Sequence, residues 1–168
     1  MFEIGEHIVY GTSGICRVEE ICRSPYDKDD ARNFYLLIPV YNPTSATIYT
    51  PVDNERVPMR RLMTREEIEV LISAIPQIEM VQVPVEKQRR EIYRNTIGAL
   101  RPEGYVSVMK TVEHRREVLT AARKHFPVSD IEYGQVAKHM LYSEFAQVLG
   151  MAENDVEAYI MQKLALAE

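Results

Sequence analysis

The sequence contains no tryptophan and only two cysteines in 168 residues. Two cysteines cannot form the several bridges of a disulfide-stabilised secreted scaffold, and the spacing between Cys16 and Cys22 does not match the short pairs that bind zinc. Apolar runs are short, and the opening "MFEIGEHIVY" lacks the basic and apolar regions of a signal peptide. We therefore expect a cytoplasmic protein with reduced thiols and no membrane contact.

The sequence also lacks the motifs of the common enzyme classes. It has no glycine-rich phosphate loop and no nucleophile elbow around a serine. Its histidines have no carboxylate or cysteine at the spacing of metal ligands; they are His7, His114, His125 and His139. We therefore expect no catalysis, no metal site and no cofactor.

Positive charge is scarce overall but concentrated in one stretch. The net charge is -5, yet residues 85–126 carry twice as many Lys and Arg as Asp and Glu, and the stretches on either side are acidic. The segment "EKQRREIYRNTIGAL", residues 86–100, holds Lys87, Arg89, Arg90 and Arg94 within eight positions. Such a segment is typical of a contact with a polyanion, although amphipathic helices also expose Arg and Lys without binding one.

The first 60 or so residues predict β structure. Short runs of β-branched and apolar residues, such as "EHIVY", "GICRVEEIC", "FYLLIPVY" and "TIYTPV", are separated by turns rich in Gly, Pro, Asn and Ser. Pro39 and Pro51 each lack a ladder donor and are expected at strand ends or on an edge. Five short strands in so few residues favour a small, strongly bent barrel.

From Thr64 onward the pattern predicts helices. Thr64 and Glu67 form a capping-box pattern, and Ser129 and Glu132 form a second one. Pro102 suits a first helical turn, and Gly150 suits a helix C-cap. We expect helices from Thr64, then over 86–99, 102–125 with a possible break near His114, 129–149 and 152–166. The fold class is α+β, with a β module over 1–62 and an all-α domain over 63–168.

The opening "MFEIGEHIVYGTSGICRVEEI" resembles the CarD family of bacterial RNA polymerase-binding regulators, whose first module is shared with transcription-repair coupling factor. The resemblance rests on Phe2, Gly5, Val9 with Tyr10, Gly14 and the strand from Ile15 to Ile21. It continues through "FYLLIPV" and "TIYTPVDN", and then by pattern through "IYRNTIGAL" and "SDIE". It implies a Tudor-like β-barrel followed by a compact helical domain.

The resemblance also implies a function. In this family the β module adds a strand to the polymerase β subunit, and the helical domain contacts upstream promoter DNA and stabilises the open complex. The polymerase-facing positions fall on Arg23, Ser24, Ile48, Tyr49 and Thr50. We expect a monomer on polymerase and a DNA contact without sequence specificity, to the backbone and minor groove.

The DNA-binding positions implied by the resemblance lie in the basic segment, 86–126. They are Arg89, Arg90, Tyr93, Arg94, Arg115 and Arg116. Independently of the resemblance, Arg90 and Arg94 are four residues apart, so a helix presents both on one face to phosphates.

Three positions depart from the family pattern. Arg89 stands where the family commonly has a tryptophan wedge, Tyr49 where it often has an arginine, and Tyr133 where it often has a basic residue. An arginine could enter a narrow minor groove but would not fill space as an apolar wedge does.

Two other functions remain open. The helical domain could recruit another protein to polymerase instead of DNA, which the missing tryptophan and the acidic last third favour. Alternatively, the β module could bind RNA as a KOW-type barrel, but such a barrel should be basic and this half of the chain is acidic.

Overall fold

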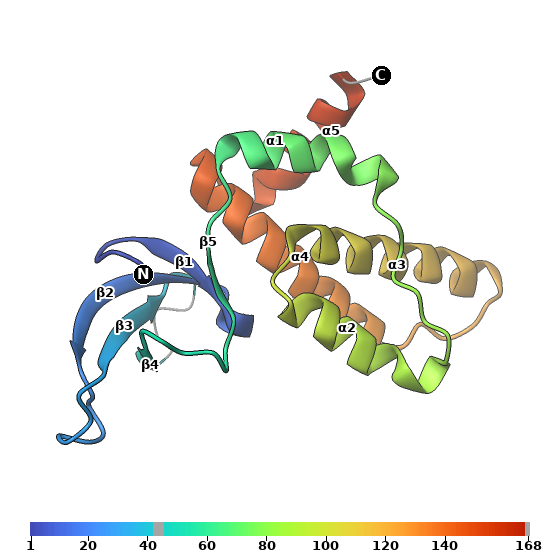
Figure 1. Ribbon diagram of the computed structural model, residues 1–168. Helices are drawn as coiled ribbons and strands as arrows, with labels where there is room; N and C mark the ends of the chain where they lie inside the picture. The colour runs from blue at the N-terminus through green and yellow to red at the C-terminus, as the bar shows by residue number, and fades with distance from the viewer. Residues whose placement is uncertain (42–45, 167–168) are drawn as a thin grey trace. The chain divides into compact units, whose positions relative to one another are not determined.

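The computed structural model describes residues 1–41 and 46–166. The chain forms two compact units, Met1–Leu62 and Met63–Glu168. The first unit is a β-sheet, and all of the described α-helices belong to the second (Figure 1). The fold class is therefore α+β. None of the described helices combines the length and apolar character that crossing a membrane requires.

The first unit is a five-stranded antiparallel sheet with the order β4-β3-β2-β1-β5. Its strands are β1 His7–Tyr10, β2 Ile15–Arg23, β3 Asn33–Pro39, β4 Ile48–Pro51 and β5 Met59–Arg61. Pro39 and Pro51 are the last residues of β3 and β4, as predicted. The register between β2 and β3 shifts between Val18 and Glu20, and such a bulge increases the local twist of a strand.

The core of this sheet comes from the alternation of its strands. Ile8, Cys16, Val18, Tyr35 and Leu37 are all at most 1% exposed and pack against one another. Figure 1 shows the sheet strongly curved around this core. In the described residues β4 and β5 each pair on one side only, so the sheet is open and the expected closed barrel is not confirmed.

The described residues of the second unit form five α-helices and three short 3-10 turns. The helices are α1 Arg65–Ala74, α2 Arg89–Gly98, α3 Pro102–Ala121, α4 Val128–Leu149 and α5 Val156–Leu166. The 3-10 turns of this unit are η2 Ile75–Gln77, η3 Glu86–Gln88 and η4 Glu153–Asp155. Buried apolar side chains from every helix form its core, among them Ile68, Ile97, Val108, Phe145 and Val156.

Three helix-end predictions are confirmed. Thr64 caps α1 through its side chain, and Glu67 completes the capping box. Pro102 opens α3, and Gly150 ends α4 in the left-handed conformation with φ 69°. Pro102 suits that place because the first turn of a helix needs no amide donor from it, and Gly150 because it has no Cβ to strain a positive φ.

Two other helix predictions are wrong. Ser129 and Glu132 do not form a capping box, because α4 begins at Val128 with Pro127 as its N-cap and no side-chain cap. Proline fixes its own φ, so the helix starts directly after it and Ser129 lies inside the first turn. The predicted break near His114 is also absent, since α3 continues through it to Ala121.

A lysine joins α3 to the end of α1. Lys110 Nζ donates to the carbonyl oxygens of Ile75 at 3.0 Å, Pro76 at 3.3 Å and Ile78 at 2.6 Å. These carbonyls follow the last turn of α1, where a cation is favourable because the helix dipole is negative. The ammonium therefore donates to carbonyl oxygens that no longer receive an amide N–H from a following turn of the helix.

The two cysteines are expected to react very differently with alkylating reagents. Burial raises the pKa of the Cys16 thiol to about 11, whereas Cys22 is partly exposed. Only the thiolate is a good nucleophile, so at mildly alkaline pH the native protein should be modified at Cys22 and spared at Cys16. Peptide mass spectrometry after iodoacetamide treatment measures this, and unfolded protein should be modified at both. Equal modification of the two thiols in the native state would contradict the burial of Cys16.

Candidate functional site

The first candidate site is the free edge of strand β4. This strand pairs with β3, where Tyr35 lies opposite Thr50 and Leu36 opposite Tyr49. The Val52 amide donates to the Asn33 carbonyl at 2.9 Å. Inward and outward hydrogen bonding alternates along an antiparallel strand, so Thr50 bonds toward β3 and the backbone of Tyr49 faces the open edge. The geometry at this edge is the one that strand addition needs.

The side chains of the predicted polymerase-facing positions differ in accessibility. Thr50 is buried, with 2% exposure, and Ile48 packs against the core of the sheet. Tyr49 is half-buried, and its ring meets that of Tyr26 edge-on at 6.1 Å between centroids. Tyr26 is 76% exposed, so the aromatic surface beside the edge includes a residue from the loop between β2 and β3.

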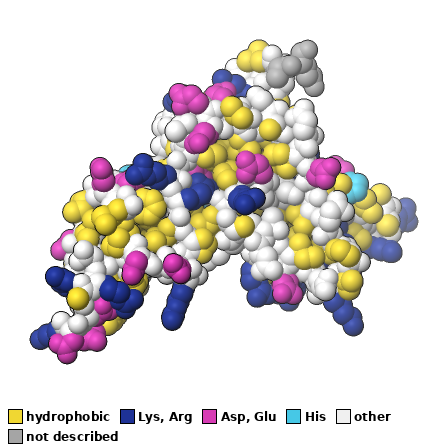
Figure 2. Space-filling view, viewed as in Figure 1, with side chains coloured by type: hydrophobic (Ala, Val, Ile, Leu, Met, Phe, Trp, Pro, Cys, Tyr) yellow, Lys and Arg dark blue, Asp and Glu magenta, His cyan; other side chains and the backbone are white. Residues whose placement is uncertain are grey.

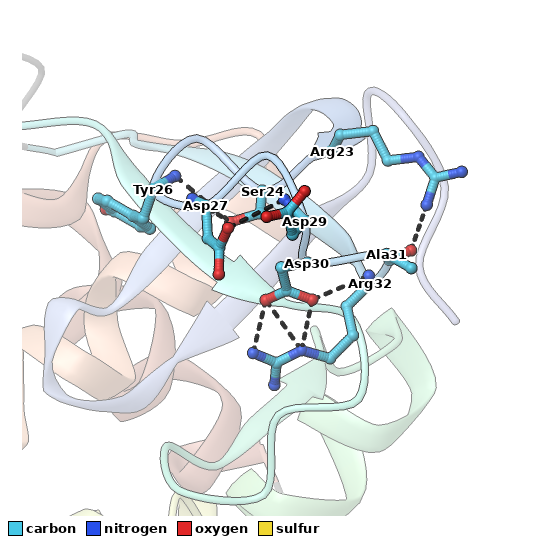
Figure 3. A network of polar contacts seen from close by, with 8 residues as sticks. All are labelled: Arg23, Ser24, Tyr26, Asp27, Asp29, Asp30, Ala31 and Arg32. Atoms are coloured by element: carbon cyan, nitrogen blue, oxygen red, sulfur yellow. Dashed lines mark hydrogen bonds and ion pairs between the residues drawn. The ribbon is translucent and has the colours of Figure 1, made fainter.

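Arg23 and Ser24 shape that loop (Figure 3). The Arg23 guanidinium donates to the Ala31 carbonyl across the base of the loop. Ser24 Oγ accepts from the amides of Tyr26 at 3.3 Å and Asp27 at 3.2 Å. These bonds stabilise the loop, and its contact with the edge strand is the one between Tyr26 and Tyr49.

An exposed ion pair lies at the end of the same loop. Arg32 Nη2 and Asp30 Oδ2 are 2.7 Å apart. Hydrogen bonds from the Arg32 side chain, and then from its backbone, lower the pKa of Asp30 to about 2. The loop therefore keeps this carboxylate ionised at any ordinary pH.

The second candidate site is the basic segment, 86–126, of the helical unit. Its centre is a closed ring of five polar side chains, which we name the Asp130 ring: Glu86, Arg89, Tyr93, Arg115 and Asp130. They come from η3, α2, α3 and α4. Asp130 and Tyr93 are both 0% exposed.

The bonds of the Asp130 ring run from one helix to the next. Asp130 Oδ1 accepts from the Tyr93 hydroxyl at 3.1 Å, and Oδ2 accepts from Arg115 Nε at 3.0 Å. Arg115 Nη2 also donates to Glu86 Oε1 at 2.7 Å. Arg89 closes the ring, because it donates to Glu86 from Nε and Nη2 and to the Tyr93 hydroxyl from Nη1.

The Asp130 ring is electrically balanced. It contains two carboxylates and two guanidinium groups, and hydrogen bonds from Arg89 lower the pKa of Glu86 below its usual value. Burial raises the pKa of Tyr93, which keeps its hydroxyl neutral and able to donate to Asp130. Arg89 and Arg115 therefore add little to the positive field outside the protein, although both were predicted to contact DNA.

The other predicted DNA-binding cations are exposed. Arg90 and Arg94 lie on the outer face of α2, and neither forms an ion pair with any residue that the structure describes. Arg116 on α3 is half-exposed and lies 3.7 Å from Glu113. The structure thus divides the six predicted residues into a buried ring (Arg89, Tyr93, Arg115) and an outer surface (Arg90, Arg94, Arg116).

The arginine at the family's wedge position is held inside the Asp130 ring. The Arg89 side chain is 14% exposed and its guanidinium lies 5.7 Å from the centre of the Tyr93 ring. Tyr133, the third departure from the family pattern, packs edge-on against the same Tyr93 ring at 5.8 Å. Tyr133 therefore packs α4 against α2, whereas Arg89 bonds to residues of η3 and α2.

Comparison with known proteins adds a finding on the first unit. Residues 2–63 match the family model of the CarD-like/TRCF RID domain. The first unit is a CarD-like/TRCF RID module. The match ends where the helical unit begins, so it assigns the RID module alone. No curated protein matches the chain.

Three residues of these sites were missed by sequence reasoning: Glu86, Asp130 and Tyr26. Asp130 follows Pro127 by three positions and reads as an ordinary acidic residue of a first helical turn; nothing in its neighbours shows that Arg115 and Tyr93 reach it. Tyr26 lies in a charged loop, where an aromatic residue stands out. Its exposure beside β4 could have been suspected from that contrast.

Proposed function

We propose that the protein is a transcription regulator that binds the β subunit of RNA polymerase through its RID module. The observation that carries this proposal is the family match of residues 2–63. The open edge of β4 supports it, because the backbone of Tyr49 is free to pair with a strand of another protein. Co-purification of the full chain with polymerase, and with its isolated β subunit, tests the interaction.

The helical unit, in this proposal, contacts upstream promoter DNA and stabilises the open complex. The exposed pair Arg90 and Arg94 supports a contact with phosphates, which is positioning and not sequence-specific. Each neutralised phosphate releases counterions, so affinity should fall as salt rises. Such a contact is weak alone, which suits a protein brought to promoters by polymerase.

Neutralising this pair is expected to shorten the lifetime of the open complex. In the double variant Arg90→Gln/Arg94→Gln, two phosphate contacts are lost while the Asp130 ring stays intact. The lifetime should fall about tenfold, which corresponds to about 1.4 kcal/mol. A competitor challenge of preformed promoter complexes measures it.

A matched control removes the same charge elsewhere in the helical unit. Arg65 begins α1 and Lys163 lies on α5, where it pairs with Glu69 at 3.1 Å. The double variant Arg65→Gln/Lys163→Gln should leave the lifetime unchanged. Equal lifetimes for both double variants would refute the DNA contact of α2 and leave polymerase binding untouched.

A second candidate function is a polymerase-bound adaptor whose helical unit recruits a protein. The Asp130 ring favours this alternative, because it takes Arg89 and Arg115 out of the surface available to DNA. Footprinting of promoter complexes distinguishes the two functions. A DNA-binding regulator should change protection near the −10 element, whereas an adaptor should not.

A further inference from the structure

The end of α3 and the turn that follows it carry a second group of cations, which we name the basic turn: Arg116 on α3, and Arg123 and Lys124 after it. Helix α3 ends at Ala121, and the chain then closes the helix with two backbone bonds. The Arg123 amide donates to the Thr120 carbonyl at 3.0 Å, and the Lys124 amide donates to Leu119 at 2.8 Å. This is the Schellman arrangement, in which glycine is the usual residue after the helix.

Arg123 occupies that glycine position with φ 52°. A side chain in the left-handed region brings its Cβ too close to the next carbonyl oxygen, which strains the backbone. Glycine would end the helix without this strain. An arginine therefore stands where the local structure prefers glycine, and residues strained in this way concentrate at functional sites.

The three cations of the basic turn point to solvent. Arg123 and Lys124 are exposed, and across residues 1–41 and 46–166 neither forms an ion pair. The Arg116 guanidinium lies 5.1 Å from the centre of the Phe126 ring and 3.7 Å from the exposed Glu113 carboxylate, a long surface pair that is screened by solvent. Figure 2 shows Lys and Arg side chains gathered over the part of the helical unit where α3 ends.

The basic turn lies at the same end of the helical unit as the start of α2. Arg115, near the end of α3, reaches Glu86 of η3 at 2.7 Å, and α2 follows η3 directly. Helix α3 continues six residues beyond Arg115 to Ala121, so the turn that holds Arg123 starts about 9 Å farther along the helix axis. Each strand of a DNA duplex carries one phosphate per about 3.4 Å of axis, so one duplex can present phosphates to both places.

We propose that the basic turn is a second contact with the phosphate backbone of the DNA duplex that α2 binds. This inference rests on the proposed function of the helical unit. It adds a contact that is separate from Arg90 and Arg94 in sequence and in secondary structure. Two contacts on one compact unit fix the direction of the duplex across it, whereas one exposed pair on α2 leaves the duplex free to pivot.

Binding of the full chain to a fluorescently labelled duplex tests the proposal. Anisotropy titrations over a range of salt concentrations compare the unmodified chain with Arg123→Gln/Lys124→Gln. Affinity at low salt should fall about tenfold, and the slope of log affinity against log salt should decrease by about 2, one for each lost cation. The control double variant Arg65→Gln/Lys163→Gln should change neither quantity.

A second variant separates binding from folding. Arg123→Gly removes the cation and relieves the positive φ, so the helical unit should melt about 2–4 °C higher while its affinity for DNA falls. A role confined to ending α3 would raise the melting temperature and leave the salt slope unchanged. That outcome would overturn the proposal.

The remaining outcomes distinguish the proposal from the function on which it rests. If Arg90→Gln/Arg94→Gln weakens binding and Arg123→Gln/Lys124→Gln behaves as the control does, the basic turn is not a contact and the DNA function stands. If all three double variants bind as the unmodified chain does, or if the chain binds no duplex at any salt, both claims fail. An acidic protein partner would then explain the exposed cations.

Discussion

Replacing Asp130 by alanine is expected to lower the free energy of unfolding of the helical unit by about 3 kcal/mol. The carboxylate is fully buried and accepts hydrogen bonds from both Tyr93 and Arg115. Its removal leaves a guanidinium without its buried partner, which costs more than the loss of a hydrogen bond between neutral groups. We place the effect at the lower end of the range for broken buried pairs because the Arg115 side chain is 22% exposed.

Urea unfolding followed by far-ultraviolet circular dichroism measures this effect selectively. All α-helices in the described part of the chain belong to the helical unit, so the helical signal reports on that unit. A matched control is Glu157→Gln, which breaks the exposed pair between Glu157 and Lys138. Exposed pairs contribute at most about 1 kcal/mol, so the control should be close to neutral.

A double-mutant cycle isolates the bond between Asp130 and Arg115. The single variants Asp130→Ala and Arg115→Ala and the double variant should give a coupling energy of about 1–3 kcal/mol. A coupling near zero would mean that the two side chains act independently and that the Asp130 ring is not a unit. Arg115→Ala should also leave the RID module unaffected.

Introducing proline at Tyr49 is expected to weaken polymerase binding by more than about tenfold. The backbone of Tyr49 faces the open edge of β4, and proline has no N–H to donate to an added strand. The inward bonds to β3 come from Thr50 and its alternating neighbours, so the sheet itself should tolerate the change. Quantitative co-purification with the isolated polymerase β subunit measures the loss.

Tyr49→Ala is the matched control for this prediction. It removes the ring that contacts Tyr26 but keeps the backbone donor. We expect it to retain most of the affinity, because the main-chain bonds of strand addition do not depend on the side chain. Equal losses for proline and alanine would show that the side chain, and not the open edge, makes the contact.

The fold could largely be anticipated from local patterns. Period-two runs and turn residues predicted the strands, and the capping box at Thr64 predicted the start of α1. Predictions failed where two local signals competed. At the start of α4 the capping pattern of Ser129 was overridden by Pro127, which begins the helix one residue earlier. At the end of α3 an arginine adopts the glycine conformation, so the helix stops at Ala121 and not near residue 125.

The candidate site was harder to anticipate than the fold. Charge and spacing identified the basic segment but could not show which cations point outward. Arg89 and Arg90 are neighbours in sequence, and helical geometry turns them by about 100° relative to each other. One closes the Asp130 ring and the other is exposed. Arg89 bonds to its near neighbours Glu86 and Tyr93, and these two are held by Arg115 and Asp130 from α3 and α4. No local pattern connects the near neighbours to those distant residues.

The brevity of strand β4 limits how a partner strand can align with it. Only four residues, Ile48–Pro51, form the strand, and the alternation leaves Tyr49 and Pro51 facing outward. If the partner strand shifted its register by two residues, it would pair with Pro51 in place of Tyr49. Proline has a backbone C=O but no N–H, so one of the two backbone hydrogen bonds of that residue pair would be lost. One alignment is therefore favoured over its neighbours. A partner held by so few backbone hydrogen bonds should dissociate quickly unless side chains around Tyr26 slow its release. Substitutions near Tyr26 should therefore change the residence time of the partner.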